Sequence, residues 1–286
     1  MRTVGIIERN TSGEPSLISP TTIDELSHFL KERKTAPLHI TSGAEEQSGI
    51  ETLSMGGFNR IVTYEPEEMI VIAEAGITLI ELQNALKEKG QWIPTLVSEE
   101  NPEATLGAAI ARDHYHPRSR SMGMLRTTIL GGTFCSSYGE VFKSGSRVVK
   151  SVAGYDIHRS FCGSEGLFGV IVHATLKTAP LPEQLYYFET SLSNKKDIDN
   201  YHPSIIEERN GKLFVELSGM REDVSADIEE ITSSRIQHRA IAHDETQATI
   251  KNIIALKAKK KLDTSSREYE LLTEIRRAFD PEGILV

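Results

Sequence analysis

The chain has 286 residues, of which 38% are hydrophobic and 26% are charged, a composition typical of a folded globular protein with a sizeable core. Its formal net charge of −9 at pH 7 disfavours a nucleic-acid-binding protein, because phosphate backbones require a basic surface. It contains 2 cysteines, which excludes a disulfide framework and a self-contained iron–sulfur cluster. We find no apolar run near the roughly 18 residues that span a bilayer, and the first residues lack the pattern of a signal peptide. We therefore expect a cytoplasmic protein, with peripheral membrane attachment through partners as an alternative.

The N-terminal part of the chain alternates short strands with amphipathic helices. Thr22 before Asp24 and Glu25 is a helix-start signal, and Thr78 opens a second helix that Gly90 ends. The predicted helices are residues 20–33, 79–89, 105–111 and 157–162. The predicted strands are residues 38–41, 61–64, 69–75, 129–138, 140–143 and 170–176.

The sequence pattern changes after Pro180–Pro182. Strands are predicted at residues 185–192, 213–217 and 235–242, and helices at 224–231 and 245–256. This mixture predicts a second, α+β unit. We expect two domains, residues 1–182 and 183–286, and a basic helix end at residues 257–261 that faces solvent.

Glycines recur through residues 145–178, and glycine allows positive φ and close approach of the backbone to a ligand. Within this stretch, Val152–Asp156 and Gly163–Ile171 resemble the FAD-binding domain of the p-cresol methylhydroxylase / vanillyl-alcohol oxidase type. Residues 211–219 are similar to a strand of the second domain of the glycolate oxidase E subunit, and residues 275–285 are similar to a C-terminal helix and turn shared across that family. The resemblance implies an α+β, two-subdomain FAD-binding fold followed by a small α+β C-terminal domain.

The resemblance also implies a set of residues around a non-covalent FAD, since no histidine lies in the loop 42–49 where a covalent anchor is expected. The implied set is Thr41, Ser42, Gly43, Ala44, Thr105, Leu106, Gly107, Ala108, Arg118, Gly154, Tyr155, Asp156, Gly163, Ser164, Gly166, Gly169, Val170 and Ile171. No catalytic residue and no metal ligand is predicted; a site built from His114 and His116 lacks carboxylates beyond Asp113.

The FAD diphosphate needs a cradle of backbone N–H groups. Residues 105–108 resemble the family's Thr-(Leu/Ile)-Gly-Gly turn with alanine at the last position, a small change if φ of Ala108 is negative. The first loop keeps Gly43 but gains Glu45 and Glu46. A carboxylate about 4 Å from a phosphate costs about 1 kcal/mol in water and about 4 kcal/mol at intermediate dielectric. The loop therefore opposes FAD if these acids point inward and is neutral if they face solvent.

Arg118, Tyr155 and Asp156 have two open interpretations each. Arg118, or its neighbour Arg120, supplies a cation to the diphosphate, or belongs to a structural loop or partner contact. Tyr155 packs on a flavin ring and Asp156 caps the helix 157–162, or both are purely structural. His173 stands where the family has a glutamate and is expected to be structural.

Two functions follow from the resemblance. In the first, the chain is an FAD-binding subunit of a glycolate or 2-hydroxy-acid dehydrogenase-like complex, exchanging electrons with a larger FAD-containing catalytic subunit and an iron–sulfur subunit. In the second, it is a degenerate paralogue without FAD that serves such a complex as a structural or regulatory subunit. The second part of the chain shows no His/Arg/Tyr constellation suited to oxidising a hydroxy acid, so whether the chain is itself an enzyme stays open.

Overall fold

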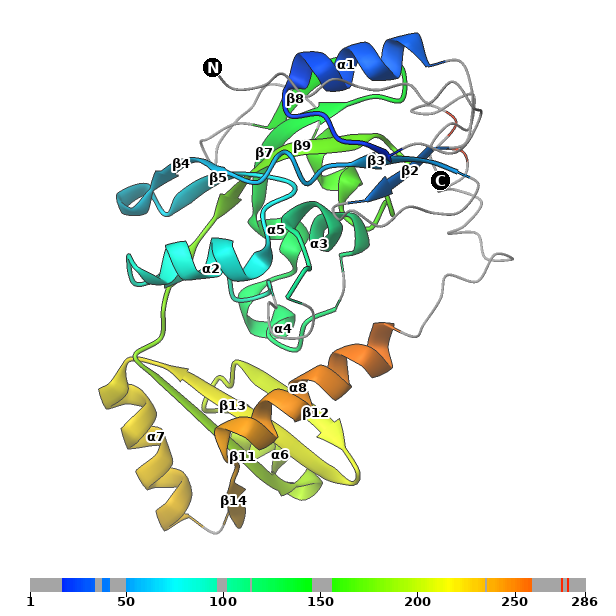
Figure 1. Ribbon diagram of the computed structural model, residues 1–286. Helices are drawn as coiled ribbons and strands as arrows, with labels where there is room; N and C mark the ends of the chain where they lie inside the picture. Colours follow the sequence, from blue (N-terminus) through cyan, green and yellow to red (C-terminus); the bar gives the residue numbers. More distant parts are fainter. Residues whose placement is uncertain are drawn as a thin grey trace.

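The computed structural model describes residues 17–33, 38–41, 50–96, 102–113, 115–145, 156–234 and 236–258, together with Glu274 and Arg277. The described chain forms two bodies, one above the other in Figure 1. We call them the N-terminal unit, residues up to Pro180, and the C-terminal unit, residues from Gln184 onward. The predicted boundary at residue 182 lies in the connection between them, and their status as separate domains stays a prediction.

The N-terminal unit contains two principal sheets and one small strand pair. Three parallel strands lie in the order β1 (Leu17–Ile18), β3 (Glu51–Ser54) and β2 (Leu38–Thr41). Five antiparallel strands lie in the order β4 (Ile61–Glu65), β5 (Ile70–Glu74), β9 (Val170–Lys177), β7 (Ile129–Cys135) and β8 (Val141–Gly145). β6 (Gln91–Trp92) pairs with β10 (Ala179–Pro180).

The three longer helices of this unit begin within three residues of their predicted starts. These are α1 (Ile23–Glu32), α2 (Leu79–Lys87) and α3 (Leu106–Arg112), with short helices α4 (Ser119–Met122) and α5 (Leu125–Thr128) and 3-10 turns η1 (Pro66–Glu68) and η2 (Ile157–Phe161). The short elements α4, α5 and η1 were not predicted. The Thr22 side chain accepts a hydrogen bond from the Glu25 N–H at 3.2 Å. Thr78 and Glu81 form a reciprocal capping box at α2. These caps satisfy N–H groups that a helix start leaves unpaired.

Side chains on the five-stranded sheet alternate between two cores. Phe134 and Ile171 pack with α2 and α3, whereas Cys135, Val170 and Val172 pack with α1 and the three-stranded sheet. This alternation follows from the two-residue period of a strand. The five-stranded sheet is therefore covered on both faces, and β9 reaches both cores.

The C-terminal unit is one antiparallel sheet with helices on both faces. Its strand order is β12 (Ile205–Arg209), β13 (Lys212–Gly219), β11 (Gln184–Ser191), β14 (His238–Ala240). The helices are η3 (Leu192–Asn194), α6 (Lys195–Asp199), α7 (Arg221–Ser233) and α8 (His243–Ala258). Val215 packs with α6 and α7, and Phe214 packs with α8, which crosses the sheet in Figure 1. The α+β fold class is confirmed.

Several local details differ from the sequence-based expectations. Residues 157–162 form a 3-10 turn instead of a regular helix, and the predicted strand 235–242 is shortened to His238–Ala240. Strands β3 and β12 were not predicted. Within the described ranges, no helix is long and apolar enough to cross a membrane.

Candidate functional site

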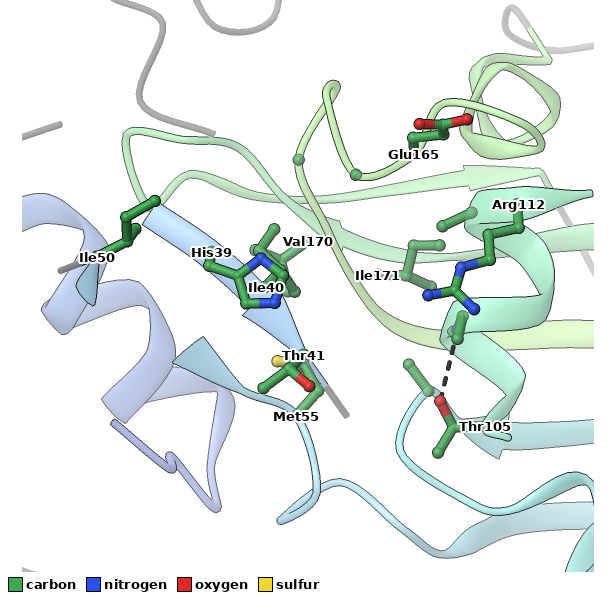
Figure 2. A pocket seen from close by; sticks show the side chains of 16 residues that line it. His39, Ile40, Thr41, Ile50, Met55, Thr105, Arg112, Glu165, Val170 and Ile171 are labelled. Atoms are coloured by element: carbon green, nitrogen blue, oxygen red, sulfur yellow. Dashed lines mark hydrogen bonds between the residues drawn. The ribbon is translucent and has the colours of Figure 1, made fainter. Parts of the chain in front are cut away.

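A cavity of about 680 Å³ opens between β2, α3 and the start of β9 (Figure 2). Its size lies within the range of small-molecule and cofactor sites. It is lined by His39, Ile40, Thr41, Ile50, Met55, Ala75, Thr105, Gly107, Ala108, Ala111, Arg112, Glu165, Gly166, Gly169, Val170 and Ile171. The fold thus brings together segments that lie more than a hundred residues apart in the chain, including several of the predicted ones: Thr41, Thr105, Gly107, Ala108, Gly166, Gly169, Val170 and Ile171.

The β9 wall of the cavity depends on a glycine. Gly169 has φ +139°, and a Cβ there would meet the Cys135 carbonyl oxygen at 2.5 Å. Only glycine combines this φ with such close packing against β7. The backbone at Gly169 is therefore held at the cavity wall, with Val170 and Ile171 following it on β9.

The α3 wall begins at Thr105, whose side chain caps the helix by accepting from the Ala108 N–H at 3.5 Å. The Leu106 N–H donates to the Ile77 carbonyl at 3.0 Å, and the Gly107 N–H donates to the Ala75 carbonyl at 2.7 Å. Ala108 is helical and is not among the described residues with positive φ, so alanine is tolerated there. The first-turn N–H groups of α3 therefore already have partners in the protein.

The sequence analysis missed three lining residues with titratable side chains: His39, Arg112 and Glu165. Arg112 is the last residue of α3, and Figure 2 shows its guanidinium reaching along the cavity toward Thr105. Glu165 has φ +51°, and its N–H donates to the Ala111 carbonyl at 2.8 Å. Arg112 lies about two helical turns after Thr105, so the two residues share one face of α3. This spacing was the signal from which the sequence analysis could have placed Arg112 beside Thr105.

Other predicted residues lie outside the cavity lining. Leu106 is fully buried in the core beside α2. The Ser164 hydroxyl donates to the Phe161 carbonyl at 3.0 Å, and the Gly163 N–H donates to the Ile110 carbonyl at 3.0 Å. These residues shape the turn that leads into β9. Ser42, Gly43, Ala44, Gly154 and Tyr155, as well as Glu45 and Glu46, lie outside the residues that the structure describes.

The predicted capping role of Asp156 is corrected. Its carboxylate makes no capping hydrogen bond to η2 and instead lies 3.5 Å from Arg159 in an exposed ion pair.

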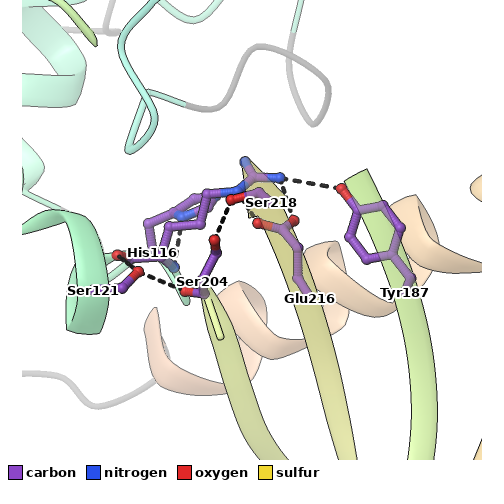
Figure 3. A network of polar contacts seen from close by, with 7 residues as sticks. His116, Ser121, Tyr187, Ser204, Glu216 and Ser218 are labelled. Carbon is purple, nitrogen blue, oxygen red and sulfur yellow. Dashed lines mark hydrogen bonds and ion pairs between the residues drawn. The ribbon is translucent and has the colours of Figure 1, made fainter. Parts of the chain in front are cut away.

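The prediction that Arg118 meets a phosphate is also corrected, because its guanidinium is already paired elsewhere. Arg118 Nε and Nη2 donate to the two carboxylate oxygens of Glu216 at 2.8 and 2.6 Å, and Nη2 also donates to the Tyr187 hydroxyl at 3.3 Å (Figure 3). The guanidinium lies over the Trp92 ring, 4.8 Å from its centroid. Arg118 therefore joins the two units, which agrees with the structural alternative in the sequence analysis.

Burial controls the protonation of this network. His116 is buried, and desolvation, with the nearby Arg118 charge, lowers its pKa to about 3. Its Nδ1 accepts from the Arg118 backbone N–H at 3.1 Å. Burial opposes the charge of Arg118, but the bonds to Glu216 outweigh this and raise its pKa. A neutral histidine thus lies beside a permanently charged pair.

His173 lies on β9, opposite Glu74 on one side and Thr133 on the other. Burial lowers the pKa of His173, and His173 is not part of the cavity lining. Its structural role stays a prediction. Among the described residues, no group of His, Cys, Asp and Glu side chains is arranged to hold a metal ion.

The cavity is walled by glycine backbone, small side chains and a capped helix and lies between a parallel and an antiparallel sheet. These features are typical of a small-molecule or cofactor site. Comparison with known families points to the class of the protein: residues 16–145 match the family model described as "FAD binding domain". FAD is the cofactor that this domain indicates.

The chain is also similar to individual curated proteins. The chain is 32% identical over 148 residues to "Glycolate oxidase subunit GlcE" of Escherichia coli, covering 52% of this chain and 41% of that protein. It is 26% identical to "Glycolate oxidase subunit GlcD" of Bacillus subtilis (59% and 37% covered) and 30% identical to "D-lactate dehydrogenase [cytochrome], mitochondrial" of Arabidopsis thaliana (58% and 30% covered). The matches thus span less than half the length of these curated relatives.

A solved structure confirms the fold. An alkyldihydroxyacetonephosphate synthase superposes with a TM-score of 0.63 at 12% identity, covering 84% of this chain and 54% of that one.

The residues present fit FAD in shape. The cavity of about 680 Å³ has apolar walls at Ile40, Val170 and Ile171 and narrow side chains at Ala108 and Ala111. Apolar walls with a few polar groups are usual for cofactor sites. The polar lining side chains that could orient a bound dinucleotide include Thr41, Thr105 and Arg112.

Proposed function

We propose that the chain is the FAD-binding subunit of a glycolate or 2-hydroxy-acid dehydrogenase-like complex. In this complex it exchanges electrons with a larger FAD-containing catalytic subunit and an iron–sulfur subunit. The observation that carries the proposal is the cavity between β2, α3 and β9, in a chain whose residues 16–145 match the model of an FAD binding domain. Relatives named as glycolate oxidase subunits and D-lactate dehydrogenases support the class of reaction.

The proposal divides the work between protein and cofactor. Bound FAD supplies hydride or electron acceptance, while the protein supplies position and electrostatics. We propose that residues 1–182 hold FAD without a covalent bond and that residues 183–286 form a cap beside them. The Arg118–Glu216 pair supports a fixed position for that cap. We propose a cytoplasmic location, or attachment to a membrane through the partner subunits.

A second function, a subunit that has lost FAD, is favoured by one observation. The first-turn N–H groups of α3 have partners within the protein, so fewer backbone donors are left for a diphosphate. In that case the subunit keeps its fold in order to assemble with its partners. The complex then still forms, although this subunit carries no flavin and is colourless.

The deciding experiment is purification of the chain with the products of its neighbouring genes, followed by an absorbance spectrum. About one FAD per chain, released by heat into the supernatant, supports the first function and a non-covalent cofactor. Flavin that stays on the denatured chain contradicts non-covalent binding and directs attention to His39, which lines the cavity. A colourless subunit that still joins the complex supports the second function.

A cavity variant makes this experiment specific to the site. Ala108→Leu places a larger side chain on the α3 wall at a helical position and is expected to abolish flavin retention. Ala226→Leu, the same change at an exposed position of α7, is the matched control and should retain flavin. Equal flavin content in the two variants would mean that FAD binds outside this cavity.

A further inference from the structure

We infer that Arg112 is the residue that holds the diphosphate of FAD in this cavity, in place of the backbone N–H groups of α3. The inference rests on the proposed function and deepens it by assigning the anionic contact to one side chain.

The first argument concerns the donors that α3 offers. A helix start commonly binds phosphate through its unpaired N–H groups. Here the N–H groups of Leu106, Gly107 and Ala108 are bonded to the Ile77 carbonyl, the Ala75 carbonyl and the Thr105 hydroxyl. Binding a phosphate here would first break these bonds, so this helix start offers an anion less than one whose N–H groups are unpaired. An anion in this cavity therefore needs a donor from elsewhere.

The second argument concerns the availability of Arg112. Its side chain is exposed, lines the cavity and, among the described residues, makes no hydrogen bond or ion pair. Its neighbour Asp113 does not neutralise it, because the Asp113 carboxylate lies 3.3 Å from Arg126. Arg118 and Arg159 are likewise paired, with Glu216 and Asp156. Among the arginines of this region that the structure describes, Arg112 thus has a guanidinium that remains available to a ligand.

The third argument concerns direction. Asp113 adopts a left-handed conformation, φ 41° and ψ 48°, which ends α3 directly after Arg112. Figure 2 shows the Arg112 guanidinium extending back along the cavity toward Thr105, while Glu165 lies on the opposite loop. Arg112 and Glu165 form no ion pair with each other within the described structure. One side of the cavity therefore carries a positive charge and the other a negative charge. A diphosphate is favoured at Arg112, and the planar guanidinium suits its paired oxygens.

The test compares FAD with riboflavin, which carries the same ring without phosphates. Dissociation constants are measured by flavin fluorescence for the wild type, Arg112→Gln, Arg112→Lys and the control Lys89→Gln, an exposed charge after α2 and outside the cavity. For Arg112→Gln, we expect FAD affinity to fall about 10- to 100-fold. Riboflavin affinity should change less than about 2-fold, as should both affinities of Lys89→Gln. The FAD affinity of Arg112→Lys should lie between those of the wild type and Arg112→Gln. Lysine keeps the positive charge but cannot donate two parallel hydrogen bonds to a phosphate as the guanidinium can.

Several outcomes would overturn the inference. Unchanged FAD affinity in Arg112→Gln would show that the side chain does not reach the diphosphate. Equal losses for FAD and riboflavin would assign Arg112 to the shape of the cavity instead. Both outcomes leave the proposed function intact. A wild-type chain that binds neither flavin, alone or in its complex, would instead overturn the proposed function and the inference together. Ligand-free melting temperatures of the variants separate lost binding from lost folding.

Discussion

Arg118, in the loop before α4, is bound by both carboxylate oxygens of Glu216, on an inner strand of the C-terminal sheet, at 2.8 and 2.6 Å. Glu216 is fully buried and Arg118 nearly so. Around this pair, the Ser121 hydroxyl donates to the Ser204 carbonyl at 2.8 Å, and the Tyr115 hydroxyl donates to the Glu207 carboxylate across the same junction. The two units are therefore joined by a desolvated polar network and not by hydrophobic packing alone.

Removing one partner of the Arg118–Glu216 pair should strongly destabilise the folded chain. We expect Glu216→Gln to lower the free energy of unfolding by about 3–5 kcal/mol, because it leaves the Arg118 charge buried without its counter-ion. Urea unfolding, followed by circular dichroism, measures the change. The control is Asp199→Asn, which removes the exposed partner of Arg120 at the same junction, and there we expect at most about 1 kcal/mol. Similar losses in both variants would show that the buried pair contributes no more than a surface one.

Stability should decrease at acidic pH because of His116. Its pKa is about 3 in the folded chain and about 6.5 in an unfolded one. Between these values the unfolded state binds a proton that the folded state does not, so stability is complete above pH 6.5 and declines as the pH falls toward 3. The decline from this group is about 1.4 kcal/mol per pH unit.

The contribution of His116 is isolated by comparison with His116→Asn. Unfolding curves at several pH values should give the wild type a steeper loss below pH 6.5 than the variant. Parallel pH profiles would contradict the assignment, and any loss shared by both proteins then belongs to other groups, such as His158 and His173, whose pKa values burial also lowers.

Both cysteines should be unreactive in the folded protein. Burial raises the pKa of Cys135 and of Cys162 to about 12, so the thiolate that reacts is scarce at neutral pH. We expect iodoacetamide at pH 8 to label neither residue in native protein and both in denaturant. Mass spectrometry of the labelled peptides measures this. Rapid native labelling of Cys135 would mean that the β7–β9 region opens readily, because Cys135 is fully buried there.

The two glycines Gly169 and Gly211 allow a test of the cavity wall. Both have positive φ, +139° and +76°, but a Cβ at Gly169 would meet the Cys135 carbonyl at 2.5 Å, whereas nothing lies within 4 Å of one at Gly211. We expect Gly211→Ala to cost about 1–2 kcal/mol from its conformation alone and Gly169→Ala about 1–3 kcal/mol more from the clash. Thermal unfolding measures both. Gly169→Ala should also lose flavin; if it retains flavin at full affinity, the backbone there does not shape the site.

Local sequence signals determined much of the architecture. The hydrophobic period, the capping residues Thr22 and Thr78 and the turn glycines predicted α1, α2 and most strands of the five-stranded sheet within a few residues. These signals act between near neighbours, so they can be recognised in the chain itself. Short strands such as β1 and β3 carry too few residues to show a period, and the sequence analysis missed them. Of the residues implied by the resemblance of Gly163–Ile171, Gly166, Gly169, Val170 and Ile171 line the cavity, and their contact with FAD stays a prediction.

Tertiary structure alone decided which charged side chains serve which purpose. The sequence shows that Arg118 and Arg112 are cationic, but Arg118 finds its partner Glu216 98 residues away, and a long-range pairing leaves no local pattern. Arg112 lines the cavity from the end of α3, a helix that packs closely on Ala75 just after β5: a Cβ at Gly107 would meet the Ala75 Cβ at 2.9 Å. The chain by itself therefore determined the elements and the class of cofactor. Packing decided which arginine is buried as a structural ion pair and which stays available to a ligand, because burial and partner distance exist only in the folded state.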